Sequence, residues 1–385
     1  MATLHSTEIP SREELLRRAR ALAPVFRERA ARTEEARQCL PEAVDEIFDS
    51  QLNRIAVPIK WGGFDHGYDL FLEVCSELSR GCGSTGWCYG LWGCHSWLSG
   101  HWPLHAQEEI YANGPDVLIS TAGYSTNARC EQVDGGYRIS GVWEFSSGCD
   151  AASWVAVGGQ SFAGRISMLV PKGEYEIVDN WRVLGLRGTG SKNIRVEDGF
   201  VPNHRVRTSA IGDTDMTGWQ IHGQRRYRMP WRCLIIWDLV APMLGITQAM
   251  IDEFIRRMSS GAGGGKTAES VAIQLRLTNA CAALDAGRAL MRADVAEMMQ
   301  HAGRGEKFSD LQRARYDRDK AWIVHLCKDA VNSLYDVCGA HALFEDDPLQ
   351  RIHRDANALP HRDGLVVDFA GENFGRVALG LPPKS

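Results

Sequence analysis

The spacing of hydrophobic residues divides the chain into a helical first part, a β-rich middle part and a helical last part. In the first part, apolar residues recur every three or four positions, which predicts amphipathic helices. The first of these helices begins at Ser11-Arg-Glu-Glu14, a capping-box pattern, and continues through Leu15, Leu16, Ala19, Leu22, Val25 and Phe26. Further helices are predicted over residues 41–52, 68–80 and 85–99.

The pattern changes near Asp116 to short runs rich in β-branched and aromatic residues. These runs cover residues 117–120, 136–140, 154–157, 166–170 and 194–196, and turn residues such as Asp134-Gly135-Gly136 separate them. From about Arg232 the helical spacing returns, with long amphipathic segments at 244–258, 268–301 and 309–338. The order predicts an α+β protein that is mostly α, with a small β-domain between two helical parts.

Composition and charge exclude several classes of function. The 385 residues include 43 basic and 48 acidic side chains, so there is no basic surplus for nucleic acid. The polar N-terminus has no signal-peptide pattern. The longest apolar stretch, around Cys233 to Ile246, is interrupted by Asp238 and Pro242, and a membrane span needs about 18 apolar residues. We therefore expect a cytoplasmic protein without a membrane span.

Cysteines and glycines add no metal or nucleotide motif. The eleven cysteines have no repeated spacing and form no C-x-x-C pair, which predicts reduced thiols and no metal site. The stretch from Ser259 to Thr267 resembles a phosphate-binding P-loop, but Ser260 stands where that pattern needs glycine. It also follows a helical segment, so we interpret it as a loop between helices. No G-x-G-x-x-G fingerprint for a nicotinamide cofactor stands at a predicted strand-to-helix turn.

Two glycine-containing segments in the β-rich part carry candidate binding residues. In the first, Phe145, Ser146 and Ser147 place an aromatic ring beside two hydroxyls, which suits a flat heterocycle. An ordinary turn is the alternative interpretation. The second segment, Gly185 to Ser191, could let backbone amides approach a phosphate or a ring edge. Its polar side chains are Arg187, Thr189 and Ser191, and a simple connection between strands is the alternative.

Two histidines and two tryptophans are candidates for the chemistry and the substrate pocket. His361 follows Ala358-Leu-Pro after a helical segment, and its imidazole could take a phenolic proton near neutral pH. A surface or structural histidine is the alternative. His95 lies among apolar residues, where a hydrogen-bonded core histidine is the favoured interpretation. Trp231 and Trp237 could line an aromatic pocket or belong to the core.

Taken together, these segments resemble the acyl-CoA dehydrogenase superfamily over nearly the whole chain. The resemblance is carried by the helix–β–helix order and by four short segments. These are Val57-Pro58 with Gly62-Gly63, the Gly185–Ser191 loop, its exit at Val201-Pro202, and Arg354-Asp355 after a late helix. The dehydrogenases commonly carry a glutamate base in the late loop, where this chain has His361. Where they have a Trp-x-Thr-Asn type of stretch, Phe145 takes the aromatic position and Ser147 the hydroxyl position.

One branch of the superfamily is favoured by three further stretches. Phe-Ser-Ser-Gly-Cys-Asp from Phe145, Gly-Ser-Thr-Gly-Trp ending at Trp87, and the terminal Gly375 to Leu381 look like the reduced-flavin-dependent hydroxylases. That group includes the oxygenase component of 4-hydroxyphenylacetate hydroxylase, the steroid-ring phenol hydroxylase, polyketide hydroxylases and dibenzothiophene monooxygenase. The resemblance implies a homotetramer, and in each chain an N-terminal helical domain (1–112), a central small β-barrel or sandwich (113–212) and a C-terminal four-helix bundle (213–385).

The resemblance also implies a function. An NAD(P)H-dependent flavin reductase would supply FADH2 or FMNH2, and with O2 the oxygenase would form a flavin C4a-hydroperoxide that hydroxylates a phenolic, indolic or polycyclic aromatic substrate. It implies catalytic roles for Ser147, His361 and, near the flavin, His95. Flavin contacts are then expected from Phe145, Ser146, Ser147, Trp87, Arg187, Thr189 and Ser191, and a substrate pocket from Trp231, Trp237 and His95. The alternatives are an N- or S-oxygenase, an acyl-CoA dehydrogenase-type flavoenzyme, and a non-catalytic scaffold.

Overall fold

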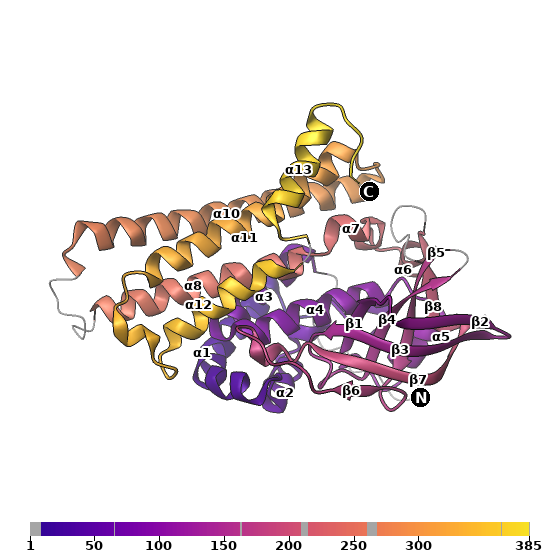
Figure 1. Ribbon diagram of the computed structural model, residues 1–385. Helices are drawn as coiled ribbons and strands as arrows, with labels where there is room; N and C mark the ends of the chain where they lie inside the picture. The colour runs from indigo at the N-terminus through magenta and orange to yellow at the C-terminus, as the bar shows by residue number, and fades with distance from the viewer. Residues whose placement is uncertain are drawn as a thin grey trace.

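The chain forms three consecutive groups of secondary structure, seen in the computed structural model of Figure 1. The structure describes residues 9–64, 66–161, 164–208, 215–259, 268–362 and 364–384. In Figure 1 the β-strands gather at one end of the molecule, while the long helices α8, α10 and α11 run side by side away from them. Helix α13 projects from the bundle near the C-terminus.

The first group is helical, as predicted. The predicted start of α1 is confirmed, because the Ser11 hydroxyl accepts the Glu14 N–H at 3.2 Å. The helix predicted over residues 41–52 is shorter in the structure. It ends at Asp49, because Gln51 adopts a positive φ of 59° and a 3₁₀ turn follows. The elements of this group are α1 (Arg12–Ala36), α2 (Pro41–Asp49), η1 (Leu52–Ile55), η2 (Ile59–Trp61), α3 (Tyr68–Gly81), α4 (Gly83–Ser99) and α5 (Leu104–Ile110).

The second group is a pair of four-stranded sheets that pack face to face. One sheet has the order β1-β4-β5-β8 and the other β2-β3-β7-β6; within them only β1 and β4 are parallel neighbours. Their inward side chains, such as Trp143, Val155 and Ile194, form a separate small core. The strands are β1 (Ile119–Tyr124), β2 (Ala128–Val133), β3 (Gly136–Ser146), β4 (Trp154–Ser161), β5 (Gly164–Pro171), β6 (Glu176–Val178), β7 (Lys192–Pro202) and β8 (Val206–Thr208).

Three of these strands are not among the predicted β runs. Strand β2 alternates partly buried and exposed residues and contains Arg129, Glu131 and Gln132, so its hydrophobic signal is weak. Strands β6 and β8 are three residues long. All three lie at sheet edges, where one side of a strand faces no neighbour and polar residues are tolerated.

The third group is the helical bundle, in which the predicted long helices are present. It contains α6 (Thr217–His222), η5 (Arg225–Arg228), α7 (Trp231–Leu234), α8 (Trp237–Ser259), α10 (Val271–Arg304), α11 (Asp310–Tyr335), η6 (Ala340–Leu343), α12 (Pro348–Ala358), η7 (Leu359–His361) and α13 (Val367–Ala378). Most of the predicted interhelical loop, residues 260–267, lies outside the described residues.

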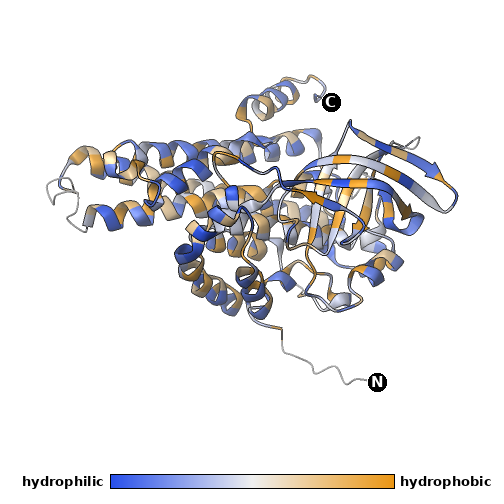
Figure 2. Ribbon diagram, turned by 60° about the horizontal axis from the view of Figure 1, so that its bottom comes forward, coloured by the Kyte–Doolittle hydropathy of each residue, from blue (hydrophilic) through white to orange (hydrophobic). Residues whose placement is uncertain are grey.

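One segment of the bundle is more apolar than the sequence analysis expected. Residues Trp231–Ser259 are long and apolar enough to cross a membrane by length and composition, although no such segment was predicted. However, 83% of the most apolar window is buried inside the protein, as in the core helix of a helical bundle. Figure 2 shows the same arrangement, with hydrophobic residues on the inward faces of the helices and alternating along the strands.

Helix α4 connects the helical core with the β-domain. Almost every residue from Gly83 to Ser99 is buried, because α4 packs against α3 and α8 on one side and against β1 and the η3 turn (Arg187–Thr189) on the other. A helix buried all round needs few charged residues, and α4 contains none among Asp, Glu, Lys and Arg. The side chains that α4 presents to the β-domain therefore help to build the candidate site.

Candidate active site

Ser147 lies in a chain of buried hydroxyl groups. Its Oγ accepts the indole N–H of Trp87 at 3.2 Å and lies 2.6 Å from the Oγ of Ser191. Ser191 in turn lies 2.8 Å from the hydroxyl of Thr189, which donates to the carbonyl of Leu186 at 2.8 Å. Four of the predicted flavin-contact residues, Trp87, Ser147, Thr189 and Ser191, are therefore brought together, although 44 positions separate Ser147 from Ser191.

The direction of the protons along this chain follows from the hydroxyl inventory. The hydroxyl of Thr189 donates its hydrogen bond to the Leu186 carbonyl, so toward Ser191 it can only be an acceptor. Ser191 then accepts the proton of Ser147. The Oγ of Ser147 has two acceptor lone pairs, of which Trp87 occupies one. One acceptor position remains on Ser147, which suits an N–H donor.

Phe145 forms an exposed aromatic wall beside this hydroxyl. The residue is 67% exposed and has a positive φ of 63°, which is unfavourable for a bulky side chain. Its ring meets the ring of Trp181 edge to face, with centroids 6.2 Å apart. Gly148 permits the turn, since a Cβ there would lie 2.5 Å from the indole nitrogen of Trp92. Backbone strain held at an exposed ring is typical of functional positions.

Ser146 points away from Ser147 and from the hydroxyl chain. It is fully buried, and its hydroxyl donates to Ser120 Oγ on β1 at 3.1 Å. The structure therefore gives the two adjacent serines different surroundings, and Ser147 is the one to which the resemblance gave the hydroxyl position. Ser147 is the one beside the exposed aromatic wall, and Ser146 joins the two sheets.

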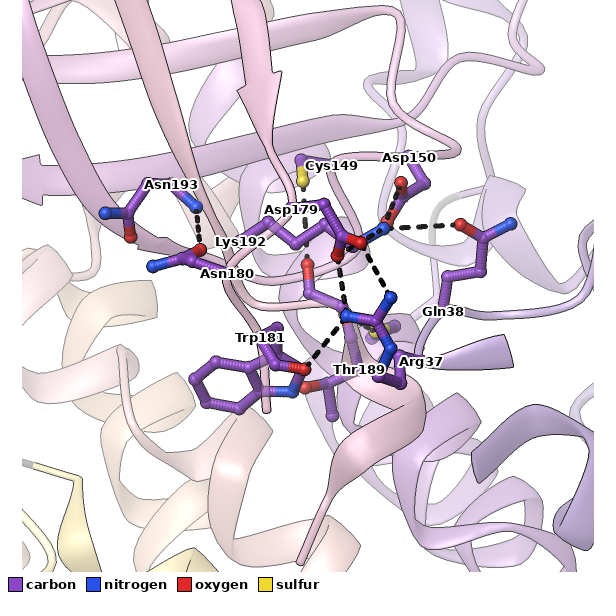
Figure 3. Close-up of polar contacts among 12 residues, drawn as sticks. Arg37, Gln38, Cys149, Asp150, Asp179, Asn180, Trp181, Thr189, Lys192 and Asn193 are labelled. Atoms are coloured by element: carbon purple, nitrogen blue, oxygen red, sulfur yellow. Dashed lines mark hydrogen bonds and ion pairs between the residues drawn. The ribbon is translucent and has the colours of Figure 1, made fainter. Parts of the chain in front are cut away.

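A polar network behind the turn fixes its position, as Figure 3 shows. The buried ammonium group of Lys192 contacts the carboxylate of Asp150 at 2.7 Å, directly after the turn. Arg37, at the end of α1, binds Asp179 through two hydrogen bonds of 2.7 and 2.6 Å and also donates to the Trp181 carbonyl at 3.4 Å. The network thus ties the aromatic wall to the first helix.

The glycine-rich segment is held by α12 from the bundle. The backbone N–H of Leu186 donates to the Asp355 carboxylate at 2.6 Å, and Arg354 donates to the Leu184 carbonyl at 2.7 Å. Burial raises the pKa of Asp355 to about 6, while the Leu186 hydrogen bond opposes that rise. Gly185 allows this close approach, since a Cβ there would lie 2.3 Å from the Arg354 carbonyl oxygen. Arg187, by contrast, is exposed and donates to the Val183 carbonyl.

His95 is buried, and both of its ring nitrogens have partners. Nδ1 lies 2.7 Å from the Ile119 carbonyl and Nε2 lies 2.9 Å from the Thr121 hydroxyl. The carbonyl can only accept, so Nδ1 carries the proton and Nε2 accepts from Thr121. Burial lowers the pKa of His95 to about 4, the Ile119 hydrogen bond opposes this, and Arg207 lowers it further. This is the hydrogen-bonded core histidine that the sequence favoured.

The remaining predicted residues lie on the bundle side. His361 ends η7 and is exposed, three residues before Gly364, where an added Cβ would lie 3.5 Å from the Ile236 side chain. Trp231 is partly buried on α7. Trp237 is fully buried in the helical core, with the Lys320 ammonium 5.6 Å from its ring centroid, so a core role is the better description of it.

Sequence reasoning missed three features of this region. Ile236 has a positive φ of 80°, and its N–H donates to the buried carboxylate of Asp238 at 2.8 Å. Burial raises the pKa of Asp238 to about 7, against the effect of its backbone hydrogen bonds. Arg207 is partly buried, with its Nε and Nη1 inaccessible to solvent, and its charge acts on His95. A single buried acid or a strained β-branched residue leaves no periodic signal, so only the structure identifies them.

One cluster could hold a metal ion, although none was predicted. His105, Glu109 and His204 bring their ligand atoms within 4.8 Å of one another. The two imidazole rings stack at 4.1 Å, and Glu109 already accepts from His204 at 3.0 Å and from Arg205 at 2.5 Å. Arg205 thus competes for the carboxylate that a metal would need. The spacing of His105 and Glu109 on one helix face was the available sequence signal.

Comparison with known proteins identifies the fold and the family. A family model described as the acyl-CoA dehydrogenase C-terminal domain matches residues 238–362. Oxygenase subunit HsaA, of a flavin-dependent monooxygenase from Rhodococcus jostii strain RHA1, is 33% identical over 377 residues, covering 95% of this chain and 98% of that protein. The oxygenase component of an FADH(2)-dependent resorcinol hydroxylase from Rhizobium sp. strain MTP-10005 is 34% identical over 390 residues, covering 96% and 95%.

A solved structure agrees with these relatives. The crystal structure of 3-HSA hydroxylase from Rhodococcus sp. RHA1 has a TM-score of 0.92 and 32% identity, covering 97% of this chain and 98% of that one. The fold is therefore that of the acyl-CoA dehydrogenases, and the protein is a flavin-dependent oxidoreductase. The chain belongs to the family of oxygenase components of flavin-dependent monooxygenases. The predicted fold class, enzyme class and flavin cofactor are confirmed.

The residues at the turn fit a reduced flavin. The reduced ring carries an N–H where the oxidised ring has only an acceptor, and Ser147 offers an acceptor position. The exposed ring of Phe145 offers an apolar face beside it. Phe145 and Ser147 would hold the ring, and Ser191 with Thr189 would keep the Ser147 oxygen oriented as an acceptor. When bound, the flavin supplies the activation of O2.

Proposed function

We propose that this oxygenase component hydroxylates a small aromatic substrate, phenolic, indolic or polycyclic, with O2 and a reduced flavin. The observation that carries the proposal is the directed hydroxyl chain, which leaves Ser147 as an acceptor suited to the reduced rather than the oxidised ring. Relatives along the whole chain support it. They include a resorcinol hydroxylase, a p-hydroxyphenylacetate 3-hydroxylase and an indole-3-acetate monooxygenase.

The protein's own contribution is to orient the ring and to keep water from the reacting atoms. The buried hydroxyls of Ser147, Ser191 and Thr189 are bonded to one another and leave no proton pointing at the ring. Around them, Trp87 and Trp92 exclude water from the turn, because both indoles are buried and donate to it. A dry surround would favour oxygen transfer to the substrate over release of hydrogen peroxide.

His361 is the proposed base for the substrate hydroxyl. It is exposed at the end of η7, and its neighbour Arg362 is close enough to lower the pKa of Asp238 electrostatically. The His361 loop therefore borders the same region as the strained Ile236. Removing or sharing a phenolic proton would raise electron density on the ring carbon that is oxidised. His95, whose nitrogens are occupied, is proposed to position β1 beside the flavin.

The test is hydroxylation with chemically reduced flavin and no reductase. FMN and FAD, each reduced under anaerobic conditions, are mixed with the protein, O2 and a panel of phenols and indoles. We expect hydroxylated product in excess of hydrogen peroxide for at least one phenol or indole. Production of peroxide alone across the panel would contradict aromatic hydroxylation, and oxidation of only amine or thioether compounds would favour N- or S-oxygenation instead.

The partners and the assembly follow from the same proposal. An NAD(P)H-dependent flavin reductase would supply the reduced flavin, in keeping with the oxygenase-component relatives. A homotetramer is supported by large apolar side chains that are exposed on two parts of the bundle, where subunits could pack together. They are Val271 and Leu275 on α10, Phe369 on α13, and Leu379 and Leu381 just after α13. All eleven cysteines are free thiols, which supports a reducing, cytoplasmic compartment.

A further inference from the structure

The guanidinium of Arg207 is buried without an acceptor for two of its nitrogens. Arg207 lies on β8, and its Nε and Nη1 are inaccessible to solvent and have no hydrogen-bond acceptor in the structure. Burial lowers the pKa of Arg207 to about 10, while Asp215 and Cys94 act in the opposite direction, so the group stays charged at neutral pH. Because a buried and unpaired charge is strongly destabilising, Arg207 is a candidate binding group.

No carboxylate within the described part of the chain forms an ion pair with Arg207. The acid with the strongest influence on it is Asp215, whose Oδ1 already accepts from the backbone N–H of Thr217 at 3.0 Å and from its hydroxyl at 2.6 Å. The face of the guanidinium lies 4.8 Å from the ring centroid of Trp102, which holds it in place. Among the described residues, the charge is thus positioned by an aromatic ring but is not neutralised by an ion pair.

Arg207 lies beside the proposed active site. Its charge acts on Cys94, His95 and His101, which follow one another at the end of α4 and just beyond it. His101 is also buried with both ring nitrogens unpartnered, so a second potential donor lies in the same region. Trp87, which binds Ser147, is seven residues before Cys94, or about 10 Å along the helix axis. A small substituted aromatic ring could span that separation.

We propose that Arg207 binds the carboxylate of the substrate, so that the enzyme acts on aromatic acids rather than on neutral phenols. The inference rests on the proposed aromatic hydroxylation and narrows its substrate class. A guanidinium pairs with a carboxylate through charge-assisted hydrogen bonds, which are the strongest available to it. The carboxylate would neutralise the buried charge, and Trp102 would keep the guanidinium fixed while the ring extends along α4 toward the flavin.

The experiment compares each carboxylate with the corresponding neutral amide. Binding of 4-hydroxyphenylacetate and 4-hydroxyphenylacetamide, and of 3-hydroxybenzoate and 3-hydroxybenzamide, is measured by tryptophan fluorescence on the flavin-free protein. We expect at least one acid to bind tenfold or more tightly than its amide. Arg207→Gln should remove that preference while changing amide affinity less than threefold, and Arg207→Lys should keep part of it. Arg129→Gln, an exposed arginine on β2, is the matched control and should keep the full preference.

Three outcomes would overturn the inference. The first is equal affinity of the unaltered protein for acid and amide. The second is an equal loss of affinity for acid and amide in Arg207→Gln. The third is a variant that binds reduced FMN more weakly but reduced riboflavin as well as before. That result would show that Arg207 binds the flavin phosphate. If Arg207→Gln does not fold, an acid that raises the melting temperature of the unaltered protein more than its amide supports the proposal, and equal shifts oppose it.

Failure of this inference is distinguishable from failure of the proposed function. Efficient hydroxylation of neutral phenols, with no advantage for acids, would remove the role of Arg207 and leave aromatic hydroxylation intact. If no hydroxylated aromatic product formed while acids still bound through Arg207, the proposed hydroxylation would be wrong and the proposed carboxylate site would stand.

Discussion

Trp87 donates its indole N–H to the hydroxyl of Ser147 at 3.2 Å, and this contact joins helix α4 to the turn after β3. The two residues are 60 positions apart, so the contact exists only in the folded protein. It occupies one lone pair of the Ser147 oxygen, and the proton of that hydroxyl goes to Ser191. The acceptor position that remains on Ser147 determines which oxidation state of the flavin the turn suits.

Replacing Ser147 with alanine is expected to uncouple the reaction. The variant loses the acceptor for the flavin N–H and leaves the Trp87 N–H without a buried partner. The fraction of O2 released as hydrogen peroxide should rise severalfold at the expense of hydroxylated product, measured by product chromatography and a peroxide assay. Ser140→Ala, in strand β3 ahead of the turn and accepting from the Asp198 N–H, serves as the control. An unchanged ratio of product to peroxide would remove Ser147 from the mechanism.

Replacing Trp87 with phenylalanine is expected to have a smaller effect of the same kind. The aromatic packing is largely kept, and only the hydrogen bond to Ser147 is lost, which costs about 1 kcal/mol of stability. Peroxide release should lie between that of the unaltered protein and that of Ser147→Ala. Uncoupling as large as in Ser147→Ala would mean that the indole, rather than the hydroxyl, governs the site.

Replacing His361 with alanine should slow hydroxylation without weakening flavin binding. Positioned acid–base catalysis contributes roughly 10² to 10⁴ in rate, and His361 is exposed on η7, so little packing is lost. Single-turnover hydroxylation and equilibrium binding of reduced flavin separate the two effects. His325→Ala, a partly exposed histidine on α11 that contacts Asp329, is the control. Normal product yield in His361→Ala would exclude His361 as the base.

Replacing Phe145 with asparagine should leave stability unchanged or raise it, while weakening flavin binding. A positive φ costs a bulky residue about 1–2 kcal/mol, and asparagine tolerates that conformation better. The Phe145 side chain is mostly exposed, so its removal costs little burial. Thermal unfolding and reduced-flavin titration measure the two quantities. A large loss of stability with unchanged flavin affinity would show that Phe145 is structural.

Asp238 should make the folded protein less stable as the pH rises. Its folded pKa of about 7 exceeds its ordinary value of 3.8, so the folded state binds the proton more tightly than the unfolded state. The stabilisation is complete below about pH 4 and is lost as the pH rises toward 7 and above, an effect of at most about 4 kcal/mol.

The variant Asp238→Asn tests this prediction, because it keeps an oxygen acceptor for the Ile236 N–H and cannot ionise. Its melting temperature should exceed that of the unaltered protein at pH 8, and the difference should shrink toward pH 5. A difference independent of pH would show that Asp238 does not titrate in this range.

The large elements were predictable because they depend on local periodicity. Helix α3 was predicted over 68–80 and spans Tyr68–Gly81. The start of α1 was predictable because the Ser11 hydroxyl caps the backbone N–H of Glu14, only three residues further along the chain. The edge strands β2, β6 and β8 were missed, because a strand without a buried face carries little hydrophobic alternation. The roles of the individual site residues remain predictions.

The sequence by itself determined the order of the helical and β-rich parts, the family, and the segment from Phe145 to Gly148 as a candidate flavin contact. Only the tertiary structure decided that Ser147 rather than Ser146 ends the hydroxyl chain, that both nitrogens of His95 are occupied, and that Arg207 is buried without an acceptor. Periodicity reports on neighbours a few residues apart. Hydrogen-bond direction and the pairing of buried charges depend on groups that are distant in the chain and meet only when it folds.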